Sequence, residues 1–149
     1  MKISTKGRYG LQALLDLAIY GENDYISLKS VAERQGMSDN YLEQLFAALK
    51  KNGLVESTRG AQGGYRLSKD ASEITVRQVL NALEGPLALV DCIIEGNQHE
   101  CDRFECCVTR VLWQKIMDEL NEVTDAISLA DLVECHKQAR LTASLEYYI

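Results

Sequence analysis

Residues 27–55 read SLKSVAERQGMSDNYLEQLFAALKKNGLV and contain two helical patterns separated by Gly36. Ser27 and Ser38 each precede an apolar run at helical spacing, as N-cap residues do. Two helices joined by a tight turn that contains glycine are typical of a helix-turn-helix. The expected inner faces are Leu28, Val31 and Ala32 in the first helix, and Leu42, Leu45, Phe46 and Leu49 in the second.

Two short β-prone runs, residues 54–58 and 65–67, follow this unit and enclose a turn with three glycines. Glycine permits the positive φ that tight turns need, so the segment predicts a β-hairpin wing. Arg59 stands at the tip, where a cation can enter a narrow minor groove. The candidate DNA contacts of the wing are Arg59, Gly60, Gly64 and Tyr65.

The second helix leaves polar side chains on its outer face near its N-terminus, where a recognition helix meets base edges. Asn and Gln can pair with adenine, and Glu can accept a hydrogen bond from cytosine. A polar face alone is more often merely solvated, but the preceding helix and the Arg-tipped wing favour DNA contact. The candidate contacts are Ser38, Asn40, Tyr41, Glu43 and Gln44, with Lys2, Lys6 and Arg8 as added phosphate contacts.

Charge is divided unevenly along the 149 residues, whose formal net charge is −6. Residues 1–69 carry a net +3, whereas residues 70–149 carry −9. The first part can therefore face phosphate although the whole chain is acidic. Because the sequence has no apolar run of about 18 residues and no signal-peptide pattern, a cytoplasmic location without membrane association is expected.

Further helical patterns frame this unit. An N-terminal scaffold helix is expected after a Thr5 cap, a helix after Thr75, and a short last helix over residues 128–137. Between the last two, a long apolar stripe is paired with an acidic face, which predicts a helix-on-helix homodimer. The stripe consists of Leu112, Ile116, Leu120, Val123 and Ile127.

Four of the five cysteines lie in one polar segment, residues 91–110. In a reducing compartment such clustering indicates metal, cluster or redox chemistry rather than a disulfide framework. The absence of a Cys-x2-Cys pair argues against structural zinc and leaves an iron–sulfur cluster or thiol–disulfide sensing. Cys135, outside the segment, is expected to be a small buried hydrophobe, and His136 a surface residue.

Three stretches carry a resemblance to a known family: MKISTKGRYGLQALLDLA, residues 32–72 and CCVTRVLW. Over about residues 1–132 the chain resembles the IscR-type iron–sulfur regulators, which are dimeric winged-helix transcription factors. The resemblance implies a repressor with a 2Fe-2S cluster held by Cys92, Cys101 and Cys107. It also implies that cluster-bearing and clusterless forms choose different classes of operator, with Glu43 at the matching selector position.

The chain departs from that family pattern at Arg110, which stands where IscR itself has a histidine ligand. Arginine cannot serve as a ligand, so the fourth position is open among Cys106, His99, a nearby carboxylate or a group from the other subunit. The ending EYYI resembles the tail of CymR-like regulators of sulfur metabolism, which lack a cluster and bind a partner protein.

These patterns together predict a mainly helical protein with a small β-wing, a winged helix-turn-helix plus a long dimerisation helix. The expected parts are a DNA-binding domain over residues 1–84, a cluster-binding loop over 85–107, and a dimerisation helix with a tail over 108–149. A metal- or thiol-dependent enzyme is disfavoured because no catalytic triad, phosphate-cradling loop or His-rich motif is present. The closer alternative is a clusterless regulator of cysteine metabolism that responds to thiol oxidation or to a protein partner at the C-terminal tail.

Overall fold

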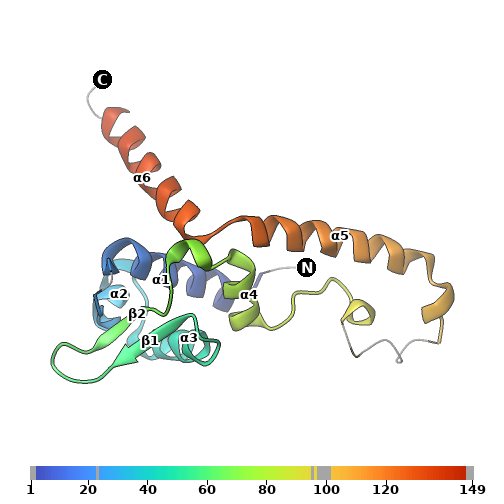
Figure 1. Cartoon of the computed structure of the whole chain (residues 1–149), viewed down its shortest axis with the longest axis horizontal. Helices are drawn as coiled ribbons and strands as arrows, with labels where there is room; N and C mark the ends of the chain where they lie inside the picture. The colour runs from blue at the N-terminus through green and yellow to red at the C-terminus, as the bar shows by residue number, and fades with distance from the viewer. Residues whose placement is uncertain (1–2, 23, 95, 97–101, 147–149) are drawn as a thin grey trace.

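The computed structural model describes residues 3–22, 24–94, 96 and 102–146. The chain is mainly helical with one two-stranded antiparallel sheet, which confirms the expected winged helix-turn-helix followed by a long helix. No helix within these ranges is both long and apolar enough to cross a membrane. The elements are α1 (Thr5–Gly21), α2 (Leu28–Gln35), α3 (Asp39–Lys51), β1 (Val55–Thr58), β2 (Gly64–Leu67), η1 (Ala71–Glu73), α4 (Val76–Glu84), η2 (Asp91–Ile93), η4 (Phe104–Cys106), α5 (Val108–Ala126) and α6 (Leu129–Glu146) (Figure 1).

Helix α1 begins with a side-chain cap at Ser4, whose hydroxyl accepts hydrogen bonds from the N–H groups of Lys6 and Gly7. The expected cap at Thr5 was wrong by one residue, because Thr5 is already the first residue of the helix. The helix ends at Gly21, and the next residue, Glu22, has left-handed backbone with φ of 38°. The cap and the left-handed residue thus define both ends of the helix.

The helix-turn-helix forms as its capping residues predict. The Ser27 hydroxyl accepts from the N–H of Ser30 at 3.2 Å, and the Ser38 hydroxyl accepts from the N–H of Tyr41 at 3.4 Å. Gly36 between the helices has φ of 64°, and a Cβ there would meet no atom within 4 Å. Glycine is therefore needed at this turn for its backbone conformation and not for space.

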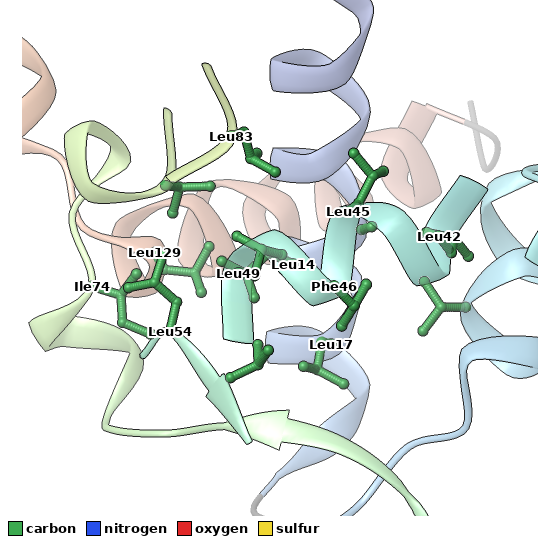
Figure 2. Close-up of a cluster of buried hydrophobic side chains, with 14 of the residues drawn as sticks. Leu14, Leu17, Leu42, Leu45, Phe46, Leu49, Leu54, Ile74, Leu83 and Leu129 are labelled. Atoms are coloured by element: carbon green, nitrogen blue, oxygen red, sulfur yellow. The ribbon is translucent and has the colours of Figure 1, made fainter. Parts of the chain in front are cut away.

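The hydrophobic core lies where α3 packs against α1 and α2. All four inner residues expected for the second helix of the unit have 0% of their surface exposed, which confirms that face. Burying one side chain of this size contributes about 1.5–3 kcal/mol to folding. Figure 2 shows these side chains converging with those of α1 and α4; the labelled core residues are Leu14, Leu17, Leu42, Leu45, Phe46, Leu49, Leu54, Ile74, Leu83 and Leu129.

The wing is fixed to the helical unit by a third short stretch of extended chain. Ile26, between α1 and α2, donates its N–H to the carbonyl of Tyr65 at 2.9 Å and accepts from the Tyr65 N–H at 2.8 Å. The close approach requires glycine at position 64, because a Cβ there would lie 2.4 Å from the Ile26 carbonyl oxygen. The base of the hairpin therefore cannot move independently of the helices.

An ion pair between the buried Asp16 and the partly exposed Arg34 joins α1 to α2. Asp16 is 1% exposed, and its carboxylate accepts from Nη2 of Arg34 at 2.6 Å and from Nε2 of Gln35 at 2.9 Å. The hydrogen bond to Asp16 raises the pKa of the Arg34 guanidinium, which also lies over the Tyr20 ring at 4.5 Å. The carboxylate is thus buried with hydrogen-bond donors from α2, as a buried charge requires.

Helix α4 carries the chain from the wing toward the cysteine segment. Thr75 and Gln78 cap it reciprocally, and Gly85 ends it with φ of 83°. Farther along the chain, the α5–α6 junction returns to this region: Leu129, which is 1% exposed, donates its N–H to the carbonyl of Ile74 at 2.8 Å. The start of α6 therefore belongs to the same core as the winged unit.

Helices α5 and α6 extend away from that core in different directions (Figure 1). Met117 is the one buried residue that α5 contributes among the described residues. Helix α6 is longer than the short helix expected, because residues 138–146 contain no glycine or proline to end it. Its outward course also exposes Cys135, so the expectation of a buried cysteine was wrong, while the neighbouring His136 is half-buried.

Candidate DNA interface and cysteine segment

The outer face of α3 is polar and exposed to solvent. Asn40, Glu43 and Gln44 are exposed, one helical turn or less apart, directly opposite the buried apolar face. The Ser38 hydroxyl caps the helix, so it is engaged with the backbone at the end that would meet a base edge. The structure therefore brings together most of the predicted reading residues on one surface of one helix.

Tyr41 differs from these residues because its ring is half-buried against α1. It makes an edge-to-face contact with Tyr9, with ring centroids 6.2 Å apart. The guanidinium of Arg8 lies 5.5 Å from the Tyr9 ring centroid. This chain of contacts places Arg8 near the start of α3, and Lys6 is exposed two residues earlier in the first turn of α1. Lys2, the third cation predicted here, lies outside the described residues.

The wing divides into an exposed tip and a packed base. Arg59 and Gly60 are exposed at the tip, and Gly60 has φ of 117°, which favours glycine. Gly64 lies at the base against Ile26, and the Tyr65 ring packs edge-on against Phe46 with centroids 5.0 Å apart. Of the four wing residues predicted to contact DNA, two are therefore at the tip and two hold the hairpin in place.

Within the described part of the cysteine segment, η2 contacts α5, and η4 directly precedes that helix. Cys92 is half-buried in η2, Cys106 is exposed in η4, and Cys107 is half-buried as the residue preceding α5. A hollow of about 360 Å³ is lined by residues of the 86–94 stretch and of α5. Cys101 and His99, the other predicted or candidate ligands, lie outside the described residues.

The environment of Cys107 favours the ionised form of its thiol. A hydrogen bond between its Sγ and the Thr109 hydroxyl, at 3.2 Å, lowers the pKa of the thiol, and the Arg110 backbone N–H adds to this effect. The lowered pKa favours the thiolate, which is the form that binds iron and reacts with oxidants. The side chain of Arg110 lies over the Phe104 ring at 4.1 Å, and its Nε is buried without a hydrogen-bond partner among the described residues.

The donor chemistry of this segment fits a thiolate-bound cluster, although the described residues alone do not complete one. Cys92, Cys106 and Cys107 are all free thiols, and a cation lies beside Cys107. Within the described ranges, no three His, Cys, Asp or Glu side chains are grouped closely enough to hold a metal ion. Cys101, the remaining predicted ligand, lies outside those ranges. The support for a cluster therefore comes from the free thiols of the segment and not from an assembled site.

Two features near this surface were not predicted from the sequence. The first is the burial of Asp16 with Arg34. The second is a contact between the end of α4 and the start of α1, in which the Glu84 carboxylate accepts hydrogen bonds from Ser4 and Gly7. Gly7 and Gly10 near the start of the helix are the signal that could have revealed this second contact, since glycine in a helix often marks a close neighbour.

A winged helix-turn-helix with an exposed polar recognition helix defines the chain as a DNA-binding transcriptional regulator. The model of the Rrf2 family, described as an iron-dependent transcriptional regulator, matches residues 3–135. The chain therefore belongs to the Rrf2 family, whose members matched here are regulators and not enzymes. This confirms the resemblance found in the sequence.

Several members of the family are similar over most of their length. The HTH-type transcriptional regulator IscR of Photorhabdus laumondii is 42% identical over 133 residues, which make up 89% of this chain and 79% of the relative. The solved structure of T. potens IscR is 43% identical, with a TM-score of 0.74 and coverage of 93% of this chain and 90% of that one. The global cysteine regulator CymR of B. subtilis is 40% identical, with a TM-score of 0.73 and coverage of 90% and 97%.

Proposed function

We propose that this Rrf2 regulator is a homodimer that senses iron–sulfur cluster status through a 2Fe-2S cluster and changes its operator choice accordingly. The observation that carries the proposal is the position of the cysteine segment, which connects the DNA-binding unit at α4 to the long helix α5. Any change in this segment acts on both the DNA-binding unit and the helix that would set the distance between two such units.

The dimer is supported by the surface of α5. Val108, Val111 and Leu112 are 83%, 59% and 50% exposed, and Val123 near the other end is 56% exposed. Together with Ile116 they form an apolar stripe along a 19-residue helix. Such a stripe on a soluble regulator is best covered by the same stripe of a second copy, since a two-fold interface is self-complementary. We expect this pairing to place two recognition helices about one DNA turn apart.

Cys92, Cys101 and Cys107 would hold the cluster. When bound, a 2Fe-2S cluster supplies a redox-active centre whose presence reports the supply of iron and sulfide. Arg110 cannot be the fourth ligand because guanidinium has no free lone pair at this pH. Cys106, His99, a nearby carboxylate or a group from the partner subunit remain the candidates for that position.

The alternative function is a clusterless regulator of cysteine metabolism that responds to thiol oxidation or to a protein bound at its tail. It is favoured by the similarity to CymR, which is nearly as high as that to T. potens IscR. The exposed Cys106 next to Cys107, whose thiol pKa is lowered, would be its reactive site. In that case, binding of a partner to the C-terminal residues 147–149 would replace cluster binding as the signal.

DNA recognition is tested by substitutions on the reading face and at the wing tip. Gln44→Ala should cost about 1–3 kcal/mol of binding free energy, mainly at one base-pair position, because one bidentate base contact is lost. Arg59→Ala should instead weaken binding to all operators, since its target is the negative potential of the minor groove. Fluorescence anisotropy titrations with single-base operator variants measure both effects.

The salt dependence of operator affinity provides a second test of whether this surface binds DNA. The affinity of the parent should fall steeply between low and physiological salt, as several phosphate contacts require. Glu73, exposed in η1 and not part of α3 or the wing, offers a control: Glu73→Ala should leave operator preference unchanged. If Gln44→Ala and Arg59→Ala both bind as tightly as the parent, α3 and the wing are not the reading elements.

Operator choice is tested at Glu43. Its exposed carboxylate is repelled by phosphate and can accept only from donors such as cytosine N4, so it should penalise sites that lack this donor. We expect the apo protein to bind one operator class, the cluster-loaded protein to bind both, and Glu43→Ala to let the apo protein bind the second class. The measurement is a titration of both operator types at fixed salt against these three forms.

The neighbouring Gln44→Ala variant serves as the control in this titration, because it alters a base contact without removing a negative charge. It should lower affinity without giving the apo protein access to the second operator class. Identical operator preferences in apo, loaded and Glu43→Ala protein would show that the cysteines do not govern DNA choice through α3.

A further inference from the structure

The last residue of α4 holds the first turn of α1. Oε1 of Glu84 accepts hydrogen bonds from the Ser4 N–H at 3.0 Å, the Ser4 hydroxyl at 2.6 Å and the Gly7 N–H at 3.0 Å. The first backbone N–H groups of a helix have no partner within the helix, so they need one from outside. A carboxylate is also the favoured group at this end, where the helix dipole is positive.

The sequence of α1 is shaped for this contact. A Cβ at Gly7 would lie 2.2 Å from Oε1 of Glu84, and a Cβ at Gly10 would lie 2.3 Å from a methyl carbon of Leu83. Two glycines close together also weaken the helix itself, because each costs about 1 kcal/mol relative to alanine. The first turn of α1 therefore depends on the end of α4 for its order.

This turn carries two of the cations that face DNA in the proposed function. Lys6 and Arg8 are the residues on either side of Gly7, and both are exposed. Arg8 also lies over Tyr9, which contacts Tyr41 at the start of the reading helix. The orientation of the two cations relative to α3 is therefore set by how firmly the turn is held.

We infer that Glu84 is a positioning residue for DNA binding, which holds Lys6 and Arg8 in the orientation that contacts phosphate. The inference rests on the proposed role of these two cations as phosphate contacts. Glu84 also lies where the chain leaves the DNA-binding unit, since Gly85 with φ of 83° follows it and Cys92 is eight residues away. Its carboxylate thus lies at the end of the winged unit nearest in sequence to the cysteine segment.

The direction in which Glu84→Ala changes DNA affinity distinguishes a positioning role of Glu84 from a simple effect of its charge. Glu84→Ala removes a negative charge from the region that borders DNA, so charge alone predicts tighter binding. Loss of positioning predicts the opposite: affinity falls by about 3- to 10-fold, and the slope of log K against log salt becomes shallower by about 1–2 as the contacts of Lys6 and Arg8 are lost. Glu84→Gln keeps an oxygen that accepts the same hydrogen bonds and should retain the parental slope.

The experiment is a set of operator titrations at four salt concentrations with the parent, Glu84→Ala and Glu84→Gln. Glu73→Ala is the matched control, because it removes an exposed carboxylate from η1, outside this contact, and should leave the slope unchanged. In a double-mutant cycle, Lys6→Ala should weaken binding in the parent and have little further effect in the Glu84→Ala background. Circular dichroism establishes that each variant is folded at the temperature of the titrations.

Ser4→Ala provides a second variant if Glu84→Ala does not fold, since it removes the hydroxyl that donates to Glu84 at 2.6 Å while leaving α4 intact. It too should make the salt slope shallower. A parental affinity and slope in Glu84→Ala, or in Ser4→Ala where that variant decides, would overturn the inference. Failure of the parent itself to bind DNA with a salt-dependent affinity would instead refute the proposed function.

Discussion

Replacing Cys92, Cys101 or Cys107 singly by alanine is expected to abolish the visible absorption of the protein after reconstitution with iron and sulfide. Each substitution removes one thiolate ligand, and a 2Fe-2S cluster with a missing ligand is readily lost. The measurement is the absorption spectrum under anaerobic conditions, with iron and sulfide counts per chain.

Cys135→Ala is the matched control, because Cys135 is an exposed thiol on α6 and not part of the cysteine segment. It should leave the spectrum intact, and an equal loss in this variant would refute the ligand assignment. Cys106→Ala tests the open fourth position, since only a ligand role predicts a changed spectrum. Anaerobically purified parent protein that contains zinc but no iron would contradict the cluster and leave the clusterless regulator.

Breaking the ion pair between Asp16 of α1 and Arg34 of α2 should destabilise the fold more than breaking either of the other ion pairs of the described residues. Arg34→Met leaves the Asp16 carboxylate, whose side chain is 0% exposed, with only Gln35 as a side-chain partner. Removing one partner of a fully buried pair costs about 3–5 kcal/mol, and this is the upper limit here because the Arg34 side chain is 31% exposed. Urea denaturation followed by circular dichroism measures the change in the free energy of unfolding.

Two further variants separate this effect from a general loss of packing. The double variant Asp16→Leu/Arg34→Met should be more stable than Arg34→Met alone, because the stranded charge is gone. Arg77→Met breaks the ion pair between Arg77 and Asp125, whose side chains are 37% and 47% exposed respectively. It should lower the free energy of unfolding by less than about 1 kcal/mol. Equal losses in Arg34→Met and Arg77→Met would mean that burial of Asp16 is not what makes its ion pair important.

The winged helix-turn-helix could be predicted because its signals are local. Ser27, Gly36 and Ser38 define helix ends within a few residues, and the core face of α3 follows from spacing alone. Asp16 could not be predicted in the same way: its burial depends on Arg34, which lies eighteen residues along the chain on another helix. A polar residue in an amphipathic pattern is ordinarily taken as solvent-facing, and only tertiary packing shows otherwise.

The structure of the second half of the chain was harder to predict from the sequence, for a different reason. Cys135 was expected to be buried because cysteine usually is, but α6 leaves the core after its first turns and exposes it. The proposed cluster ligands come from η2, from the start of α5 and from Cys101, and no periodic pattern relates such positions. Only the family resemblance identified them, and their arrangement in space is not encoded in any local signal.

Because α5 is attached to the winged unit near its junction with α6, a small rotation at that junction displaces the opposite end of α5. Its C-terminal end is tied to the winged unit by the hydrogen bond from the Val76 N–H to the Ile127 carbonyl at 2.9 Å, whereas Cys107 lies at the opposite end. A helix of 19 residues is about 28 Å long, so a rotation of about 10° at the junction moves the far end by about 5 Å. Substitutions around Ile127 could therefore change the spacing of two paired DNA-binding units without altering any residue that reads a base.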